Sequence, residues 1–295
     1  MKYAPALASA VKVVAGSASL DLGKQLAAEL KVPIVDLAFE KHPGGFPDGE
    51  RYVRLLGSVE GEHVLLVQTT WPDTKIVELF LLQDALAEHG ARKVTLVIPY
   101  FGYGRQDKKF EAGEPISARA LARRLQIHAD AVVTVSVHNP EVLSYFDVPA
   151  REVSGMPALA RFLQGAAVDL VLAPDENAER FAREVGGALG AEWDLLEKRR
   201  IDSFTVELTP KAMDVKGRSV AIVDDVISTG VTIASAAKML REQGARRIVA
   251  ACVHGVFAAN ALTRLQACDE VVATDTLLSS ATRVSVAPEV ASALR

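Results

Sequence analysis

The segment Arg218–Leu240 combines two carboxylates with a short loop of hydroxyl and glycine residues, and reads RSVAIVDDVISTGVTIASAAKML. Asp224 and Asp225 end an apolar strand, an amphipathic helix comes later, and the loop between carries Ser228, Thr229, Gly230 and Thr232. Backbone N–H groups, hydroxyls and the positive end of a helix dipole favour a phosphate there. The carboxylates would repel that anion unless they face sugar hydroxyls or a metal ion, and a pair suits two hydroxyls of a ribose. The segment therefore predicts a ribose phosphate site, against the alternative of an ordinary turn whose Asp, Ser and Gly serve for capping.

A second polar cluster follows another apolar strand and is mostly cationic: Arg105, Gln106, Asp107, Lys108 and Lys109. Cations in that place can bind a triphosphate, and Arg and Gln also suit a planar purine. The alternative is a basic surface loop that binds nothing. Phe46 lies in a different polar loop, 41–50, which holds two Pro and three Gly. Its ring either folds back as an anchor or offers its face to a base, and the residues alone leave both open.

Four further side chains are candidates for the site because they lie just after an expected strand or at the start of an expected flap. His138 follows a buried strand and precedes Asn-Pro, where a lone histidine is more often structural. Asp175 follows the apolar run 170–174 and is equally suited to capping a helix. Lys198 and Arg200 begin a segment without a helical period, which we expect to be a loop or flap. Their cations would either stabilise charge on reacting phosphates or simply be solvated at a strand end.

Apolar runs of strand length alternate with segments of helical period along the chain. The expected strands are 11–15, 63–68, 94–99, 131–137, 170–174, 220–223, 248–252 and 271–273. The expected helices are 20–30, 75–88, 117–125, 178–189 and 233–243. This alternation predicts an α/β fold with two doubly wound parallel-sheet lobes, 1–150 and 151–295, divided within 147–157. We expect the final helix to pack back on the first lobe, and ligands to bind at the carboxyl ends of the strands.

The composition is that of an ordinary globular protein, with 49% hydrophobic residues, 24% charged residues and a net charge of −4. A slight acidic excess argues against nucleic acid as a partner. Cys252 and Cys268 lack ligand spacing, which predicts neither a disulfide framework nor a zinc site. No run has the length of a membrane span and no signal peptide is recognisable, so we expect a cytoplasmic protein without a membrane partner.

The loop Asp224–Thr232 resembles the phosphoribosyl diphosphate binding motif shared by phosphoribosyltransferases and ribose-phosphate pyrophosphokinases. Two segments resemble the second family alone: PYFGYGRQDKKFEAGEPISARALA at 99–122 and FPDGERYVR at 46–54. Four more are similar in the same order, namely VSVHNPEVLSYFDVP, LAPDENAERFA, LLEKRR and AACVHGVFAANALTRL. The resemblance therefore covers almost the whole chain and implies two lobes of the phosphoribosyltransferase type.

The resemblance implies that the diphosphate of ATP is transferred to ribose 5-phosphate, which gives 5-phosphoribosyl 1-diphosphate and AMP. It assigns ATP to Phe46, Asp48, Glu50, Arg105, Gln106, Asp107 and Lys108, with Phe46 stacking on adenine. It assigns ribose 5-phosphate to Asp224, Asp225, Ser228, Thr229, Gly230 and Thr232. It further implies Mg²⁺ at His138 and Asp175, and catalysis by Lys198 and Arg200. Because the Phe46 loop reaches across a subunit interface in this family, a homo-oligomer with sites near that interface is also implied.

The sequence departs from the common family pattern at three places. Ser136 stands where many members carry an acidic neighbour of the metal histidine, which predicts weaker metal binding. Glu176-Asn177-Ala178 replace a Gly-Gly pair in a loop that cradles diphosphate, and Val231 replaces a common Gly. The short, Gly-poor flap is closer to the archaeal-type branch, which predicts the absence of phosphate activation and ADP inhibition.

Two alternative functions remain at this point. The altered loop at 176–178 favours a catalytically silent, regulatory homologue that still binds the ligands. The sugar loop alone would also fit a phosphoribosyltransferase that joins the ribose to a base. That second alternative leaves FPDGE and PYFGYGRQDKK unexplained.

Overall fold

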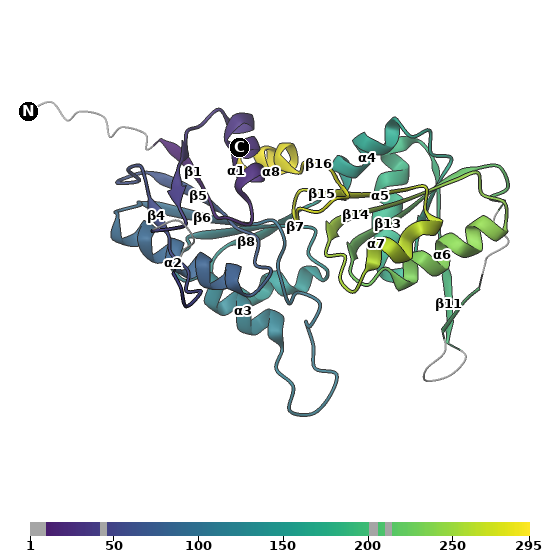
Figure 1. Ribbon diagram of the computed structural model, residues 1–295, viewed down its shortest axis with the longest axis horizontal. Coiled ribbons are helices and arrows are strands. Elements are labelled where there is room, and N and C mark those ends of the chain that lie inside the picture. Colours follow the sequence, from purple (N-terminus) through teal and green to yellow (C-terminus); the bar gives the residue numbers. More distant parts are fainter. Residues whose placement is uncertain (1–9, 42–45, 201–205, 210–213) are drawn as a thin grey trace, which may run out of the picture. The chain divides into compact units, whose positions relative to one another are not determined.

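The computed structural model describes residues 10–41, 46–200, 206–209 and 214–295. The chain divides into two compact units, Met1–Val153 with Val290–Arg295, and Ser154–Glu289. Each unit is built on one six-stranded sheet in which all neighbouring strands run parallel (Figure 1). The prediction of an α/β fold with doubly wound parallel sheets is confirmed. None of the described helices is both long and apolar enough to cross a membrane.

The first unit has the strand order β2-β1-β5-β6-β7-β8. Its sheet strands are β1 (Val11–Ala15), β2 (Ile34–Val35), β5 (His63–Val67), β6 (Lys93–Ile98), β7 (Ala131–Val135) and β8 (Ala150–Val153). Its helices are α1 (Leu20–Leu30), α2 (Thr74–Glu88), α3 (Ser117–Leu125) and the 3₁₀ helix η1 (Pro140–Tyr145). A small antiparallel hairpin, β3 (Leu37–Ala38) and β4 (Arg54–Leu55), is inserted between β2 and β5.

The second unit has the order β10-β9-β13-β14-β15-β16. Its sheet strands are β9 (Leu170–Ala173), β10 (Glu192–Leu195), β13 (Ser219–Ile227), β14 (Arg247–Gly255), β15 (Glu270–Thr274) and β16 (Thr282–Val284). Its α-helices are α4 (Met156–Gln164), α5 (Glu179–Leu189), α6 (Val231–Glu242) and α7 (Ala261–Arg264), and its 3₁₀ helices are η2 (Glu176–Ala178) and η3 (Leu265–Ala267). The last helix, α8 (Ala287–Leu294), begins in this unit and continues into residues of the first.

The two sheets share one topology. In each, the first strand of the unit lies between the second and the third, and a two-stranded antiparallel hairpin is inserted after the second strand. That hairpin is β3–β4 in the first unit, and β11 (Glu197–Arg200) with β12 (Val206–Thr209) in the second. The strand order therefore reverses between β1 and β5 and again between β9 and β13. We call this reversal the topological switch point of the sheet. In open α/β sheets it opens a crevice at the carboxyl ends of the two strands.

The core of each unit lies between its sheet and the helices that cover it. In the first unit, α2 contributes Leu79, Leu82 and Leu86 to a buried cluster with Leu66 and Leu96 of the central strands. In Figure 1, α1 lies on the face of this sheet opposite to α2 and α3. Because both faces are covered, the strands are apolar at almost every position, which is why they appear in the sequence as continuous apolar runs.

Candidate functional site

The predicted phosphate loop follows β13 in the second unit. The strand continues to Ile227, so Asp224 and Asp225 lie inside it and do not end it as expected. The reason is the neighbouring strand β14, which is equally long and pairs with β13 as far as Ile227. The connecting loop is therefore short, residues 228–230, and α6 begins at Val231. Its positive end lies directly after the loop, as the phosphate prediction requires.

Gly230 sets the geometry of this loop. It precedes the first residue of α6 with a φ of 72°, in the left-handed region that favours glycine. A Cβ at this position would lie 3.4 Å from the Cβ of Ala261 and 3.4 Å from Cγ of Leu265. The neighbouring Thr229 is exposed, and its carbonyl oxygen accepts a hydrogen bond from the guanidinium of Arg264 at the end of α7. Contacts from α7 and from Leu265 of η3 therefore hold the loop in place.

The two carboxylates before the loop are electrostatically crowded. Asp225 is buried, and Asp224 is half-buried beside it. Each accepts a hydrogen bond at Oδ1 from the next backbone N–H, at 2.9 Å for Asp224 and 2.8 Å for Asp225. Burial raises the pKa of Asp224 well above its usual value, and the negative charges of Asp225 and Asp175 raise it further. A cation or a set of hydroxyl donors would relieve this repulsion.

Asp175 belongs to the same crevice because it follows β9, the sheet neighbour of β13. Its Oδ1 accepts a hydrogen bond of 3.0 Å from the backbone N–H of Asn177, so it caps the short helix η2. Asp175 therefore does cap a helix, which was one of its two predicted roles. The cap uses one oxygen of the carboxylate, Oδ1. The departure Glu176-Asn177-Ala178 forms this helix, and its last residue, Ala178, is buried. The topological switch point of the second unit therefore carries Asp175 together with Asp224 and Asp225.

The expected flap contains an antiparallel hairpin. β11 and β12 pair with Lys198 opposite Leu208 and Arg200 opposite Val206. The expected loop is therefore partly strand, while residues 201–205 and 210–213 lie outside the described residues.

The cationic cluster of the first unit follows β6. Arg105 and Lys108 are exposed, while Gln106 and Asp107 are half-buried. The main-chain oxygen of Gln106 accepts the N–H of Ala118 at 3.2 Å, and its side-chain oxygen accepts the hydroxyl of Ser117. These contacts tie the segment to the first turn of α3.

A second set of contacts ties the same segment to the loop after β5. The Tyr103 hydroxyl donates to Asp73 at 2.8 Å, and the backbone N–H of Gln106 donates to the carbonyl of Tyr103 at 3.1 Å. Gly102 donates its N–H to the hydroxyl of Thr70 at 2.8 Å. A Cβ at Gly102 would lie 2.5 Å from the carbonyl oxygen of Thr70, so only glycine allows this approach. The cations are therefore exposed on a well-supported backbone.

His138 lies after β7, the strand next to β6, and its side chain is exposed. The adjacent Asn139 caps η1 through a 3.0 Å hydrogen bond from the N–H of Glu141 to its Oδ1. Its amide nitrogen donates to Oδ2 of Asp107 at 2.6 Å, and the Tyr145 hydroxyl donates to the carbonyl of Asp107 at 3.1 Å. The structure therefore brings the cationic cluster and the His138 turn together.

Phe46, Asp48 and Glu50 lie between β3 and β4, outside the six-stranded sheet. The ring of Phe46 packs edge-on against Tyr52, with ring centroids 5.9 Å apart. Asp48 and Glu50 are exposed, and Oδ1 of Asp48 accepts the N–H of Glu50 at 3.1 Å. Phe46 as a whole residue is half-buried, and its ring has an aromatic partner in its own chain.

Two family models match the chain. The N-terminal domain of ribose phosphate pyrophosphokinase matches residues 11–128, and the phosphoribosyl transferase domain matches residues 141–275. A ribose-phosphate pyrophosphokinase from Methanopyrus kandleri is 43% identical over 288 residues, which cover 96% of this chain and 98% of that relative. The chain belongs to the ribose-phosphate pyrophosphokinase family.

Other members of the ribose-phosphate pyrophosphokinase family are similar over a comparable length. The enzyme of that name from Methanosarcina mazei is 40% identical, with 96% of this chain and 95% of the relative covered. The crystal structure of phosphoribosylpyrophosphate synthetase from Mycobacterium smegmatis matches with a TM-score of 0.81 and 32% identity, over 97% of this chain and 98% of that one. A phosphoribosyltransferase alone would account for residues 141–275 and would leave the matched N-terminal domain unexplained.

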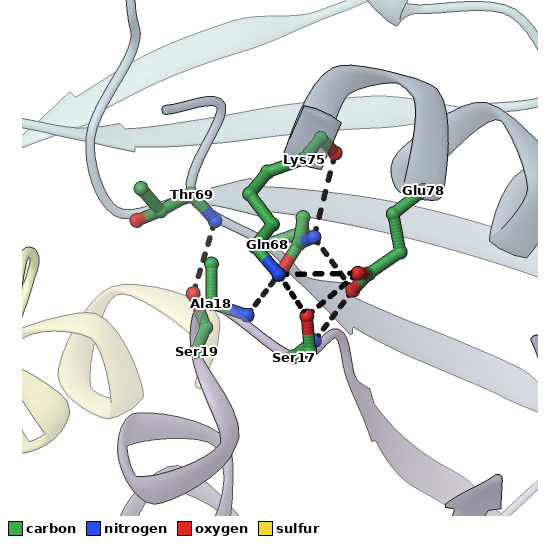
Figure 2. Close-up of polar contacts among 7 residues, drawn as sticks. All are labelled: Ser17, Ala18, Ser19, Gln68, Thr69, Lys75 and Glu78. Carbon is green, nitrogen blue, oxygen red and sulfur yellow. Dashed lines mark hydrogen bonds and ion pairs between the residues drawn. The ribbon is translucent and has the colours of Figure 1, made fainter. Parts of the chain in front are cut away.

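In this member of the pyrophosphokinase family, the switch point of the first unit is filled by the protein itself (Figure 2). The loop after β1 donates the N–H and hydroxyl of Ser17 to the two oxygens of Glu78, each at 2.6 Å. Gln68 donates to Glu78 at 3.0 Å, and the ammonium of Lys75 lies 3.4 Å from the same carboxylate. Glu78 is buried and thus takes the hydrogen bonds that a bound anion would otherwise take. Of the two crevices, that of the second unit is the better suited to a phosphate ligand.

Sequence reasoning missed several residues that support these segments. Arg264, Tyr103 and Asn139 make the contacts described above but carried no local signal of their role. Asn139 was visible only as part of an Asn-Pro pair, which marks a turn. Ser136 stands where many family members carry an acidic residue. In the structure this serine is buried and has a left-handed φ of 39°. An acidic side chain there would need its own buried partners.

Proposed function

We propose that this chain is a ribose-phosphate diphosphokinase, which transfers the diphosphate of ATP to ribose 5-phosphate. The observation that carries the proposal is the crevice of the second unit, where Asp224 and Asp225 precede a short hydroxyl-bearing loop at the N-terminus of α6. An anion at the helix and hydroxyls at the carboxylates are the two halves of a sugar phosphate. The full-length match to the pyrophosphokinase family favours this function over a phosphoribosyltransferase.

In the proposed reaction, the anomeric hydroxyl of ribose 5-phosphate attacks the β-phosphorus of ATP. A bond forms between that oxygen and the phosphorus, the bond from the β-phosphorus to the bridging oxygen of the α-phosphate breaks, and AMP leaves with the electron pair. The hydroxyl proton is lost to water or buffer. Positioning and electrostatic stabilisation supply most of such catalysis.

The proposed roles of the residues follow their places in the fold. The sugar phosphate is held by Asp224, Asp225, Ser228, Thr229, Gly230 and Thr232. ATP is held by Phe46, Asp48, Glu50 and the segment 105–108, in which Arg105 and Lys108 meet the triphosphate and Gln106 the purine. Lys198 and Arg200 stabilise charge on the phosphates and help to exclude water.

The described residues hold no group of three or more His, Cys, Asp or Glu side chains placed to bind a metal ion, so a divalent cation in the second unit would take its other ligands from water and from substrate phosphates. Burial and the negative charges of Asp225 and Asp175 raise the pKa of Asp224, so a cation placed beside these carboxylates would be attracted to them. Hard cations such as Mg²⁺ prefer carboxylate oxygens and retained water. We propose Asp175 as a protein ligand at this place in the second unit, and His138 as a metal ligand in the first unit. When bound, Mg²⁺ would neutralise phosphate charge as the diphosphate is transferred.

Two further parts of the proposal concern assembly and location. Phe46 is only half-buried and lies between two hairpin strands outside the six-stranded sheet, which supports a role in a homo-oligomer whose sites lie near a subunit interface. Light scattering of the purified protein would test this. Both cysteines are free thiols, which supports a reducing compartment such as the cytoplasm.

The test of the function is incubation of the purified protein with Mg-ATP and ribose 5-phosphate, followed by chromatography. We expect AMP and 5-phosphoribosyl 1-diphosphate to appear in equal amounts, and only when the sugar is present. Calorimetric binding of both substrates without any product would instead indicate a catalytically silent homologue. Release of ADP, or AMP formation without the sugar, would contradict the proposed reaction.

A further inference from the structure

We propose that Asp107 and Asn139 are a positioning pair, which locks the ATP-binding segment to the turn that carries His138. The inference deepens the proposed function and rests on it. The contact itself is short, with 2.6 Å between Nδ2 of Asn139 and Oδ2 of Asp107. The two residues are 32 positions apart in sequence and lie in the loops after the adjacent strands β6 and β7.

The orientation of the Asn139 amide is fixed by a second contact. Its Oδ1 accepts the N–H of Glu141 at 3.0 Å, which leaves Nδ2 as the atom that faces Asp107. The backbone of Asp107 is held as well, because its carbonyl oxygen accepts the Tyr145 hydroxyl at 3.1 Å. Asp107 is therefore bound through side chain and main chain to one element, the start and end of η1. A hydrogen bond to a charged carboxylate is among the stronger ones in proteins.

The pair connects two functional positions that are next to it in sequence. Arg105, Gln106 and Lys108 surround Asp107, and His138 directly precedes Asn139. A carboxylate within a cationic run that binds a triphosphate would weaken that binding if it faced the ligand. The Asp107 carboxylate instead accepts a hydrogen bond from the side chain of Asn139. We therefore assign Asp107 a positioning role, in which it aligns its cationic neighbours with His138.

An exchange of the two side chains tests this assignment. In Asn139→Asp, two carboxylates face each other where the 2.6 Å hydrogen bond was, so the two loops separate. We expect KM for ATP to rise roughly tenfold or more, in line with the loss of a charged hydrogen bond. The double variant Asp107→Asn with Asn139→Asp restores one amide and one carboxylate in reversed order. The carboxylate introduced at position 139 can still accept the N–H of Glu141, so we expect KM for ATP to return to within about threefold of wild type.

Four further measurements make the result specific. Glu141→Gln changes one charge in the same turn but keeps the backbone N–H that Asn139 accepts, so it should leave KM for ATP unchanged. The calorimetric Kd of ribose 5-phosphate should stay constant in all variants, because its proposed residues belong to the second unit. Thermal unfolding of each variant reports any general loss of structure. Asp107→Asn alone keeps an acceptor for Asn139 and should raise KM for ATP only about two- to threefold.

An unchanged KM for ATP in Asn139→Asp would refute the positioning role. It would also be refuted if KM for ATP in the double variant were as high as in Asn139→Asp. The same variants can be read by calorimetric ATP binding. If the wild-type protein binds ATP but forms no AMP, the proposed function is wrong. The positioning role is then tested separately, by the calorimetric affinity of the variants for ATP.

Discussion

Arg264, at the end of α7, donates a hydrogen bond to the carbonyl oxygen of Thr229 in the loop before α6. The contact holds a loop whose backbone N–H groups are proposed to bind the phosphate of ribose 5-phosphate. It connects two segments that are 35 residues apart in sequence, and both side chains lie at the surface. If the loop binds ribose 5-phosphate as proposed, Arg264 acts on that binding through the loop and not by direct contact.

From this contact we predict that Arg264→Ala raises KM for ribose 5-phosphate by roughly fivefold to tenfold, with little change in KM for ATP. Steady-state kinetics with each substrate varied in turn measures both values. Arg283→Ala is the matched control, because Arg283 also donates to main-chain carbonyls, those of Ser280 and Thr282, in the same unit. Equal effects of the two substitutions would show that Arg264 has no special connection to the sugar.

Gly230→Ala should both destabilise the protein and weaken sugar binding. The left-handed φ of 72° disfavours any Cβ by about 1 kcal/mol, and the added atom would lie in ordinary van der Waals contact, at 3.4 Å, with the side chains of Ala261 and Leu265. Gly217 has a φ of 74° but no atom within 4 Å of the place where a Cβ would lie, so Gly217→Ala carries the backbone cost alone. We expect similar losses in urea unfolding, but a weaker calorimetric affinity for ribose 5-phosphate only in Gly230→Ala. An unaltered affinity in that variant would remove the loop from the sugar site.

Asp224→Asn should stabilise the ligand-free protein at neutral pH while it weakens sugar binding. The pKa of Asp224 is raised in the fold, so its contribution to stability is fully present below its unfolded pKa of 3.8 and is lost as the pH rises through the folded value. A neutral Asn avoids this loss and still accepts the N–H of Asp225. The midpoint of thermal unfolding should exceed that of wild type by roughly 2 °C or more near pH 8, and this difference should shrink toward pH 4.

The matched control for that experiment is Asp214→Asn, which removes an exposed carboxylate from the same unit. It should change neither the midpoint nor the calorimetric affinity for ribose 5-phosphate. A stabilisation by Asp224→Asn that is independent of pH would show that the charge of Asp224 is not its cause.

Lys198→Ala should lower kcat by roughly a hundredfold or more and leave KM for ribose 5-phosphate nearly constant. The reason is that the proposed contact forms mainly with charge that develops on the transferred phosphates. Arg199→Ala is the natural control, because it removes a cation at the position next to Lys198 in sequence, which has no proposed role in the reaction. Single-turnover measurements would separate the chemical step from product release. If only KM changed, Lys198 would be a binding residue and not a catalytic one.

Helices and strands with strong periodicity were predictable to the residue. The bounds of α1, α3 and β1 agree with the sequence prediction, because apolar residues at helical or strand spacing define a buried face without reference to distant segments. The paired acids and the hydroxyl loop of the sugar site were likewise predictable, since they lie within nine consecutive residues. The division into lobes 1–150 and 151–295 remains a prediction, beside the compact units that the contacts define.

Other features depended on partners far away in the sequence. The extension of β13 beyond Asp225 depends on the length of its neighbour β14. The hydrogen bonds at the switch point of the first unit depend on Ser17 and Glu78, which are 61 residues apart in sequence. The pairing of Asp107 with Asn139 has the same character. No local pattern encodes which side chain meets which across a sheet, because the order of the strands decides it.

The sequence by itself thus determined the fold class, the family and the chemical character of each binding segment, because these depend on residue types at short spacing. Only the tertiary structure decided which segments support one another. Parallel strands bring loops of distant sequence to one edge of a sheet, and there hydrogen bonds and like charges act over a few ångströms regardless of their separation along the chain.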